Sequence, residues 1–268
     1  MEIRKKTEHE TEDIKLIYIP KKGELSEVNQ EFDFKQFSEF TARIEQVFKS
    51  FNQIKQSLSG LANRFQQASL AAKSASKKIV NNGWFISPNS RLDFSQIIAL
   101  QDLSHEELNV FFRQYYEEDD GVNLKMIFEN LNMHLKNSSI DNRLKKLLSE
   151  CIDTYEKEFY IVSTISLFVV VEGLIYNLFY NVTSDKLEKN NAFKSMKKKI
   201  KEKDSILEFA YLSVFDYLKK SFEYAEFSKE EPGILNRNWL LHGKSEYEIT
   251  QLDAIKMFSL IDSILEFH

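Results

Sequence analysis

The chain has few of the residues that break helices, form turns or cross-link a fold. Its 268 residues include only 7 glycines and 3 prolines, and this scarcity favours long helices over the many tight turns of a sandwich or barrel. A single cysteine, Cys151, excludes an internal disulfide and a cysteine-rich metal site within one chain. Because no two of the five histidines lie at a metal-ligand spacing, we expect neither a metal ion nor a cofactor.

Positive charge is also in short supply. The formal net charge is -5, so no overall field draws nucleic acid to the surface, and any such contact must come from a local basic patch. The N-terminus, residues 1–8, is polar and does not have the pattern of a signal peptide. We therefore expect a soluble, cytoplasmic protein.

One long apolar run approaches the length of a membrane span. Residues 161–180 are mostly apolar, and about 20 such residues are needed to cross a bilayer. Glu172 lies within this run, and a carboxylate near the middle of a bilayer is costly. We therefore expect a central buried helix of a soluble bundle and no membrane partner.

Apolar residues recur at three- and four-residue steps along most of the chain, which predicts an all-α fold. Residues 1–80 are expected to form an N-terminal arm and a long helix, residues 81–140 a helical connecting region, and residues 141–268 a compact antiparallel bundle. A capping box is expected at Ser104, and an acidic break at residues 117–121. The expected helices cover residues 32–80, 94–100, 106–116, 124–135, 141–155, 158–182, 206–227 and 250–267.

The residues with the most chemical potential lie near the C-terminus, in the octet 236–243. Arg237 precedes His242 by five positions, so on a helix starting near Ile234 the two side chains are rotated apart by about 140°. One helix therefore does not direct both side chains at one atom. The start of this helix, after Pro232 and Gly233, is expected to offer free backbone N–H groups to a phosphate. The alternative is that Arg237 and His242 simply pair with buried carboxylates.

The pattern Arg237-Asn238-x-x-x-His242 resembles the R-x4-6-H motif of the HEPN superfamily. Residues 161–180, which include Glu172 and Gly173, resemble the long core helix of that four-helix domain, and residues 235–243 with the following helix resemble its motif-bearing segment. The resemblance covers residues 140–268. The chain is also similar to a group of bacterial proteins that carry a Gly-Trp-Phe segment upstream, here residues 83–85.

The resemblance implies a metal-independent endoribonuclease that acts as a homodimer, with two motifs facing each other across the interface. His242 would take the proton from an RNA 2′-OH or give one to the leaving 5′-oxygen. Arg237 would hold the phosphate and offset its growing charge, and Asn238 would orient His242 or the phosphate. Expected settings are toxin–antitoxin pairs, phage defence and abortive infection, with an antitoxin or defence-system protein as a further partner.

Other residues are assigned supporting roles, each with an open alternative. Glu172 either positions Arg237 or His242, or forms an ion pair in the core; Tyr247 either lines the site or is an ordinary boundary tyrosine. Part of the lysine-rich segment is expected either to hold the RNA backbone or to be a solvated helix face: Lys197, Lys198, Lys199 and Lys201. The alternative function is a non-catalytic HEPN-like module that binds nucleotides or proteins.

Overall fold

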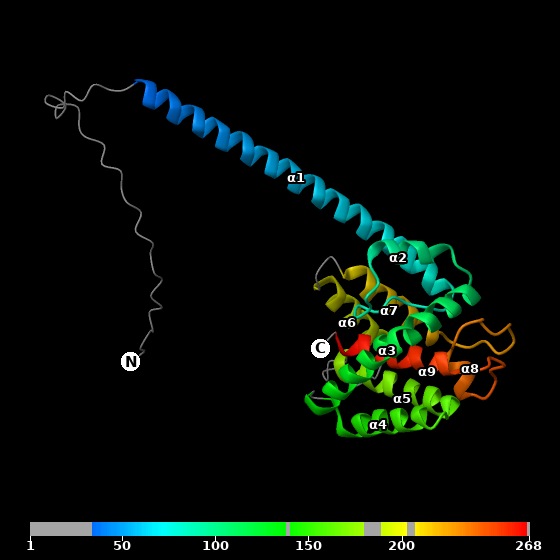
Figure 1. Ribbon diagram of the computed structural model, residues 1–268. Helices are drawn as coiled ribbons and strands as arrows, with labels where there is room; N and C mark the ends of the chain where they lie inside the picture. Colours follow the sequence, from blue (N-terminus) through cyan, green and yellow to red (C-terminus); the bar gives the residue numbers. More distant parts are fainter. Residues whose placement is uncertain (1–33, 138–139, 180–188, 203–206, 267–268) are drawn as a thin grey trace, which may run out of the picture. The chain divides into compact units, whose positions relative to one another are not determined.

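The computed structural model describes residues 34–137, 140–179, 189–202 and 207–266. Within these ranges every regular element is helical, which confirms the predicted all-α fold (Figure 1). The chain divides into two compact units, Met1–Leu58 and Ser59–His268. The second unit contains the core and the candidate site, and the expected N-terminal arm before residue 34 lies outside the described residues.

Helix α1 (Phe34–Asn81) matches the long helix expected from the apolar spacing. Its end is defined by Gly83, which has a φ of +79°. The Gly83 N–H donates to the Val80 carbonyl and the Trp84 N–H donates to the Ile79 carbonyl, which is the hydrogen-bond pattern of a Schellman motif. Since a side chain is strained at this φ, glycine is the residue that stops α1 here.

Two shorter pieces and one kinked helix follow. Helix α2 (Phe94–Ala99) and a 3-10 turn (Leu100–Asp102) lead into α3 (His105–Asn137). Ser104 and Glu107 exchange side-chain and backbone hydrogen bonds, so the predicted capping box is present. The backbone leaves helical geometry at residues 118–121 inside α3, and this confirms the predicted acidic break.

Helices α4 (Asn142–Glu156) and α5 (Tyr160–Phe179) pack closely side by side. A Cβ atom at Gly173 would collide with the Leu144 side chain, so the small residue lets the two helices approach. Among the described residues, α5 is the one helix that is long and apolar enough to cross a membrane. One of its faces is buried in the unit, whereas several apolar side chains on the rest are exposed: Ile161, Val162 and Val169.

The last four helices are α6 (Lys189–Glu202), α7 (Glu208–Ser221), α8 (Arg237–Leu241) and α9 (Gln251–Leu265). Two expected boundaries are wrong. Helix α7 ends at Ser221 rather than Phe227, and α8 begins at Arg237 rather than near Ile234 and is only five residues long.

Helix α9 is the centre of the second unit, where it packs against α3, α5 and α7 (Figure 1). Every residue from Leu252 to Leu265 is buried. Helix α5, the expected central buried helix, packs against α4, α6, α8 and α9 but is buried on one side only, whereas α9 is buried on all sides. Burying the polar face of α9 requires partners for its charges and hydroxyls, which residues 84–130 and Tyr247 largely supply: Trp84, Ser87, Asn89, Asn130 and Tyr247.

Candidate functional site

Asn236 determines where α8 begins. Its side-chain oxygen accepts hydrogen bonds from the backbone N–H groups of Asn238 (2.9 Å) and Trp239 (3.3 Å). Its amide nitrogen donates to the carbonyls of Lys220 (3.2 Å) and Glu223 (3.3 Å) at the end of α7. Asn236 is 3% exposed, so this buried side chain caps one helix and joins it to the end of another.

The capped start of α8 corrects one expectation. Free N–H groups were expected there for a phosphate, but the Asn236 side chain already satisfies two of them. A helix of five residues also has too few aligned peptide units for a strong N-terminal charge. Any phosphate must therefore be bound by side chains.

His242 lies at the other end of α8, as its C-terminal cap. Gly243 follows with a φ of +62°; its N–H donates to the Leu240 carbonyl, and the Lys244 N–H donates to the Trp239 carbonyl. This is a second Schellman motif, and it holds the backbone of His242 in place. The imidazole is exposed and meets the Phe227 ring edge-on, with 5.4 Å between centroids.

Arg237 is oriented by two neighbours. Its Nη2 donates to Glu172 Oε2 on α5 at 2.7 Å, and its Nη1 donates to Asn238 Oδ1 at 3.1 Å. Its Nε is buried and has no hydrogen-bond partner among the described residues. The side chains of Arg237 and Glu172 are 27% and 29% exposed, so this ion pair is accessible at the surface rather than sealed in the core.

The structure thus brings Glu172, Arg237 and Asn238 together and places His242 at the far end of the same short helix. Asn238 also donates from Nδ2 to the Glu223 carbonyl at 2.7 Å, so its side chain is held by the segment that follows α7 and orients Arg237. Within the described part of the chain, neither Glu172 nor Asn238 hydrogen-bonds to His242.

Tyr247 lies in the loop between α8 and α9 and supports α9. Its hydroxyl donates to Asp253 Oδ1 at 3.0 Å. Burial and the neighbouring Asp253 carboxylate raise the pKa of the Tyr247 hydroxyl. The same loop is held by Glu231, which accepts hydrogen bonds from the Ser245 hydroxyl and the Glu246 N–H.

The four lysines expected to hold a nucleic-acid backbone are all on α6, but they divide into two sets. Lys197 and Lys201 are exposed and line a hollow of about 350 Å³. Lys199 instead lies over the Phe179 ring, 5.3 Å from its centroid, and Lys198 is exposed but does not line the hollow.

That hollow adjoins a second one of about 510 Å³, since Lys77 and Asp216 line both. We call the two together the lysine groove. Its lysines come from α1, α6 and α7: Lys73, Lys77, Lys197, Lys201, Lys219 and Lys220. The pattern of the sequence did not indicate the α1 and α7 members, because they are far along the chain from α6 and no local signal joins them.

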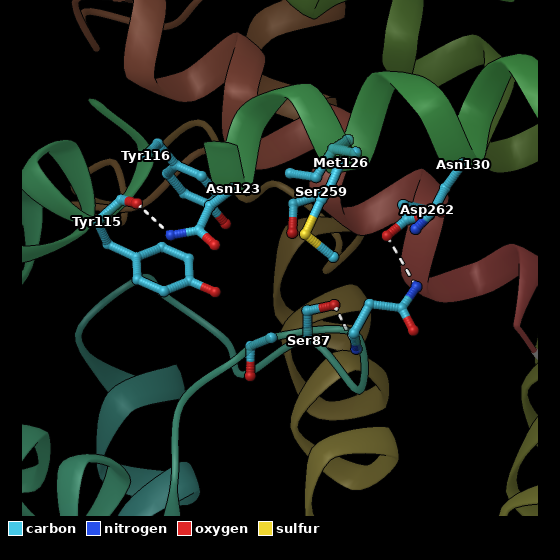
Figure 2. A pocket seen from close by; sticks show the side chains of 11 residues that line it. Ser87, Tyr115, Tyr116, Asn123, Met126, Asn130, Ser259 and Asp262 are labelled. Carbon is cyan, nitrogen blue, oxygen red and sulfur yellow. Dashed lines mark hydrogen bonds between the residues drawn. The ribbon is translucent and has the colours of Figure 1, made fainter. Parts of the chain in front are cut away.

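A separate small cavity surrounds Asp262 on α9 (Figure 2). It is about 20 Å³ in volume, which is enough for one water molecule. Asp262 Oδ2 accepts a hydrogen bond from Asn89 at 2.8 Å, whereas the buried Oδ1 has no partner among the described residues. Burial raises the pKa of Asp262 to about 6, and hydrogen bonds from Asn89 and Asn130 moderate that rise.

This raised pKa predicts a pH-dependent stability. Because the folded chain holds the Asp262 proton more tightly than the unfolded chain, the stabilisation is complete below about pH 4 and is lost as pH rises through about 6. The Asp262→Asn variant is neutral at every pH. The free energy of unfolding of the variant minus that of wild type should therefore increase by about 1–2 kcal/mol from pH 5 to pH 8. Urea denaturation measures both values. A difference that stays constant with pH, or that exposed Asp153→Asn reproduces, would contradict this prediction.

No protein-family model matches the chain, and searches of curated proteins and of solved structures find no match either.

Proposed function

We propose that the protein is a metal-independent endoribonuclease of HEPN type that acts as a cytoplasmic homodimer. The observation that carries the proposal is the geometry of α8. An exposed histidine is held at one end of this helix, and at the other end an arginine is oriented by Glu172 and Asn238. A phosphate-binding cation and a proton-transfer group are the side chains that RNA cleavage without a metal requires.

The proposed reaction uses the RNA 2′-hydroxyl as the nucleophile. His242 takes the proton from the 2′-OH, the 2′-oxygen bonds to the adjacent phosphorus, and the bond from phosphorus to the 5′-oxygen breaks. The leaving 5′-oxygen receives a proton from a second imidazole or from water. Arg237 donates hydrogen bonds to the phosphate oxygens, on which negative charge builds up. The products are a 2′,3′-cyclic phosphate and a 5′-hydroxyl.

A dimer resolves a geometric difficulty within one chain. Along a helix, five residues correspond to a rise of about 7.5 Å and a net rotation of about 140°, so Arg237 and His242 of one copy point away from each other. If two copies of α8 face each other, the arginine of one lies near the histidine of the other. The exposed apolar side chains of α5, which carries Glu172, are consistent with a surface that a second copy covers.

The test is incubation of purified protein with total RNA in the presence of EDTA. We expect cleavage to continue in EDTA and the new ends to be 2′,3′-cyclic phosphates and 5′-hydroxyls, identified by their response to polynucleotide kinase. Cleavage that stops in EDTA, or products with 5′-phosphates, would exclude the mechanism. Cut sites mapped in this way would also identify the RNA class, and with it a role in toxin–antitoxin pairs or phage defence.

The second candidate is a non-catalytic HEPN-like module that binds a nucleotide or a protein. One observation favours it: Glu172 already neutralises Arg237 within a single chain. Such a module would be a monomer that binds labelled ATP or GTP and leaves RNA intact. Size-exclusion chromatography with light scattering therefore accompanies the cleavage assay.

A further inference from the structure

The lysine groove contains several cations that have no partner among the residues that the structure describes. Lys77, Lys197, Lys201 and Lys219 are exposed, and none forms a hydrogen bond or ion pair with the described residues. The other two lysines are engaged: Lys73 pairs with Glu208 at 3.3 Å, and Lys220 donates to Asn81 Oδ1 at 2.7 Å.

The charge of the groove is opposite to that of the chain. Six lysines line it, against the three carboxylates of Glu208, Asp216 and Glu223, which leaves a local excess of three positive charges. The whole chain has a formal net charge of -5. A local cationic surface on an acidic protein concentrates anions at that one place and repels them elsewhere.

The groove ends beside α8, at Glu223. Glu223 borders both the groove and a third hollow of about 270 Å³, which Asn236 and Trp239 line as well. The Glu223 carbonyl accepts the hydrogen bonds of Asn236 and Asn238, so the end of the groove and the start of α8 are directly bonded.

One exposed aromatic side chain stands at this end of the groove, and a second lies beside His242 at the far end of α8. Tyr224 is 84% exposed and lines the third hollow. Phe227 is 43% exposed and contacts the His242 ring. Lysines along a groove combined with accessible aromatic rings are the combination by which proteins bind single-stranded nucleic acid, since the lysines attract phosphates and the rings stack on unpaired bases.

We infer that the lysine groove binds the backbone of single-stranded RNA and that Tyr224 stacks on a base where the strand reaches α8. This inference rests on the proposed function, because it identifies the substrate as single-stranded and gives its path to Arg237 and His242. It assigns binding to α1 and α7 as well as to α6.

The experiment measures binding without cleavage. The probe is a fluorescent dodecamer of 2′-O-methyluridine, which lacks the free 2′-hydroxyl that the reaction needs, and its affinity is measured by fluorescence anisotropy over a range of KCl concentrations. The triple variant Lys77→Ala/Lys197→Ala/Lys219→Ala removes one free lysine from each helix. We expect affinity to fall at least tenfold, and the slope of log K against log salt to become shallower by about 2, which corresponds to three lost phosphate contacts.

A matched triple variant changes the net charge equally at exposed lysines outside the groove: Lys125→Ala/Lys136→Ala/Lys157→Ala. It should bind the probe as wild type does. Tyr224→Ala should weaken binding about tenfold, whereas Tyr224→Phe should retain it. Equal losses in the two triple variants, or wild-type binding by the groove variant, would overturn the inference.

The outcome is separable from that of the proposed function. If the protein binds the probe through the groove but leaves RNA uncut, the binding inference stands and the nuclease proposal fails. If the protein cuts RNA through His242 and the groove variant binds the probe as wild type does, the nuclease proposal stands and the binding inference fails.

Discussion

Replacing His242 with alanine is expected to lower the rate of RNA cleavage at least a hundredfold without lowering the unfolding temperature. General acid–base catalysis contributes about 10²–10⁴-fold to rates, and the His242 imidazole is exposed and contacts the Phe227 ring. The measurement is single-turnover cleavage of a labelled RNA, with thermal unfolding of the same samples. Exposed Lys244→Ala, two residues away, is the control and should cleave as wild type does.

Arg237→Ala should lose cleavage to a similar extent, but for a different reason. It removes the cation that offsets charge on the phosphate, and the Arg237→Lys variant should recover little because lysine lacks the planar pair of donors. Its cost in stability should be about 1 kcal/mol or less, since both members of the ion pair with Glu172 are more than a quarter exposed. Cleavage at the wild-type rate by either alanine variant would refute the catalytic assignment.

Mixing the two inactive variants tests the shared site. A mixed dimer has one intact arginine and one intact histidine, and they belong to different copies. If the site is built across the interface, partial cleavage returns on mixing Arg237→Ala with His242→Ala. If each chain has its own complete site, mixing restores nothing, and the dimeric part of the proposal is wrong.

Local patterns in the sequence predicted the helical fold well because helices are stabilised by neighbours in the chain. The spacing of apolar residues placed α1, α4 and α9 within about two residues, and Ser104 and residues 117–121 marked a cap and a break. These features depend on residues three or four positions apart, so they are visible in the sequence alone.

The expected end of α7 and start of α8 are wrong because contacts between residues far apart in the sequence determine them. Apolar spacing continues past Ser221 because Phe222 and Ala225 are buried in an irregular segment. The Asn236 side chain, up to 16 residues away, donates to backbone carbonyls of this segment. The same asparagine sets the start of α8 and occupies the N–H groups expected for phosphate. The Glu172–Arg237 contact spans 65 positions, and spacing in the sequence does not distinguish a Glu172 that positions Arg237 or His242 from one that forms an ion pair in the core.

The amphipathic pattern of helix α9 does not predict that its polar face is buried. In the structure this face is buried, and the segment that begins at Gly83 contacts it through Trp84, Ser87 and Asn89. Trp84 lies over Lys256, with Nζ 4.2 Å from the ring centroid, and stacks on Phe112. The Gly-Trp-Phe segment therefore has a structural role: it ends α1 and covers a buried cation.

This arrangement makes the loss of the Asp253 carboxylate costly for stability. Lys256 is 1% exposed and its Nζ lies 3.4 Å from Asp253 Oδ1. Asp253 also accepts hydrogen bonds from the Tyr247 hydroxyl and from the backbone and hydroxyl of Thr250. Asp253→Ala should lower the free energy of unfolding by about 3–5 kcal/mol, because it leaves a buried ammonium without a counter-ion. Urea denaturation measures this loss.

A double variant separates the charge from the cap. Asp253→Asn/Lys256→Met removes both buried charges, so it should be more stable than Asp253→Asn alone, and a double-mutant cycle gives the coupling between the two side chains. The exposed pair of Glu226 and Lys229 has the same three-residue spacing, and Glu226→Ala should change stability by about 0–1 kcal/mol. If Asp253→Asn and the double variant unfold alike, the cost comes from the lost cap of α9, and the buried cation is compensated by Trp84 alone.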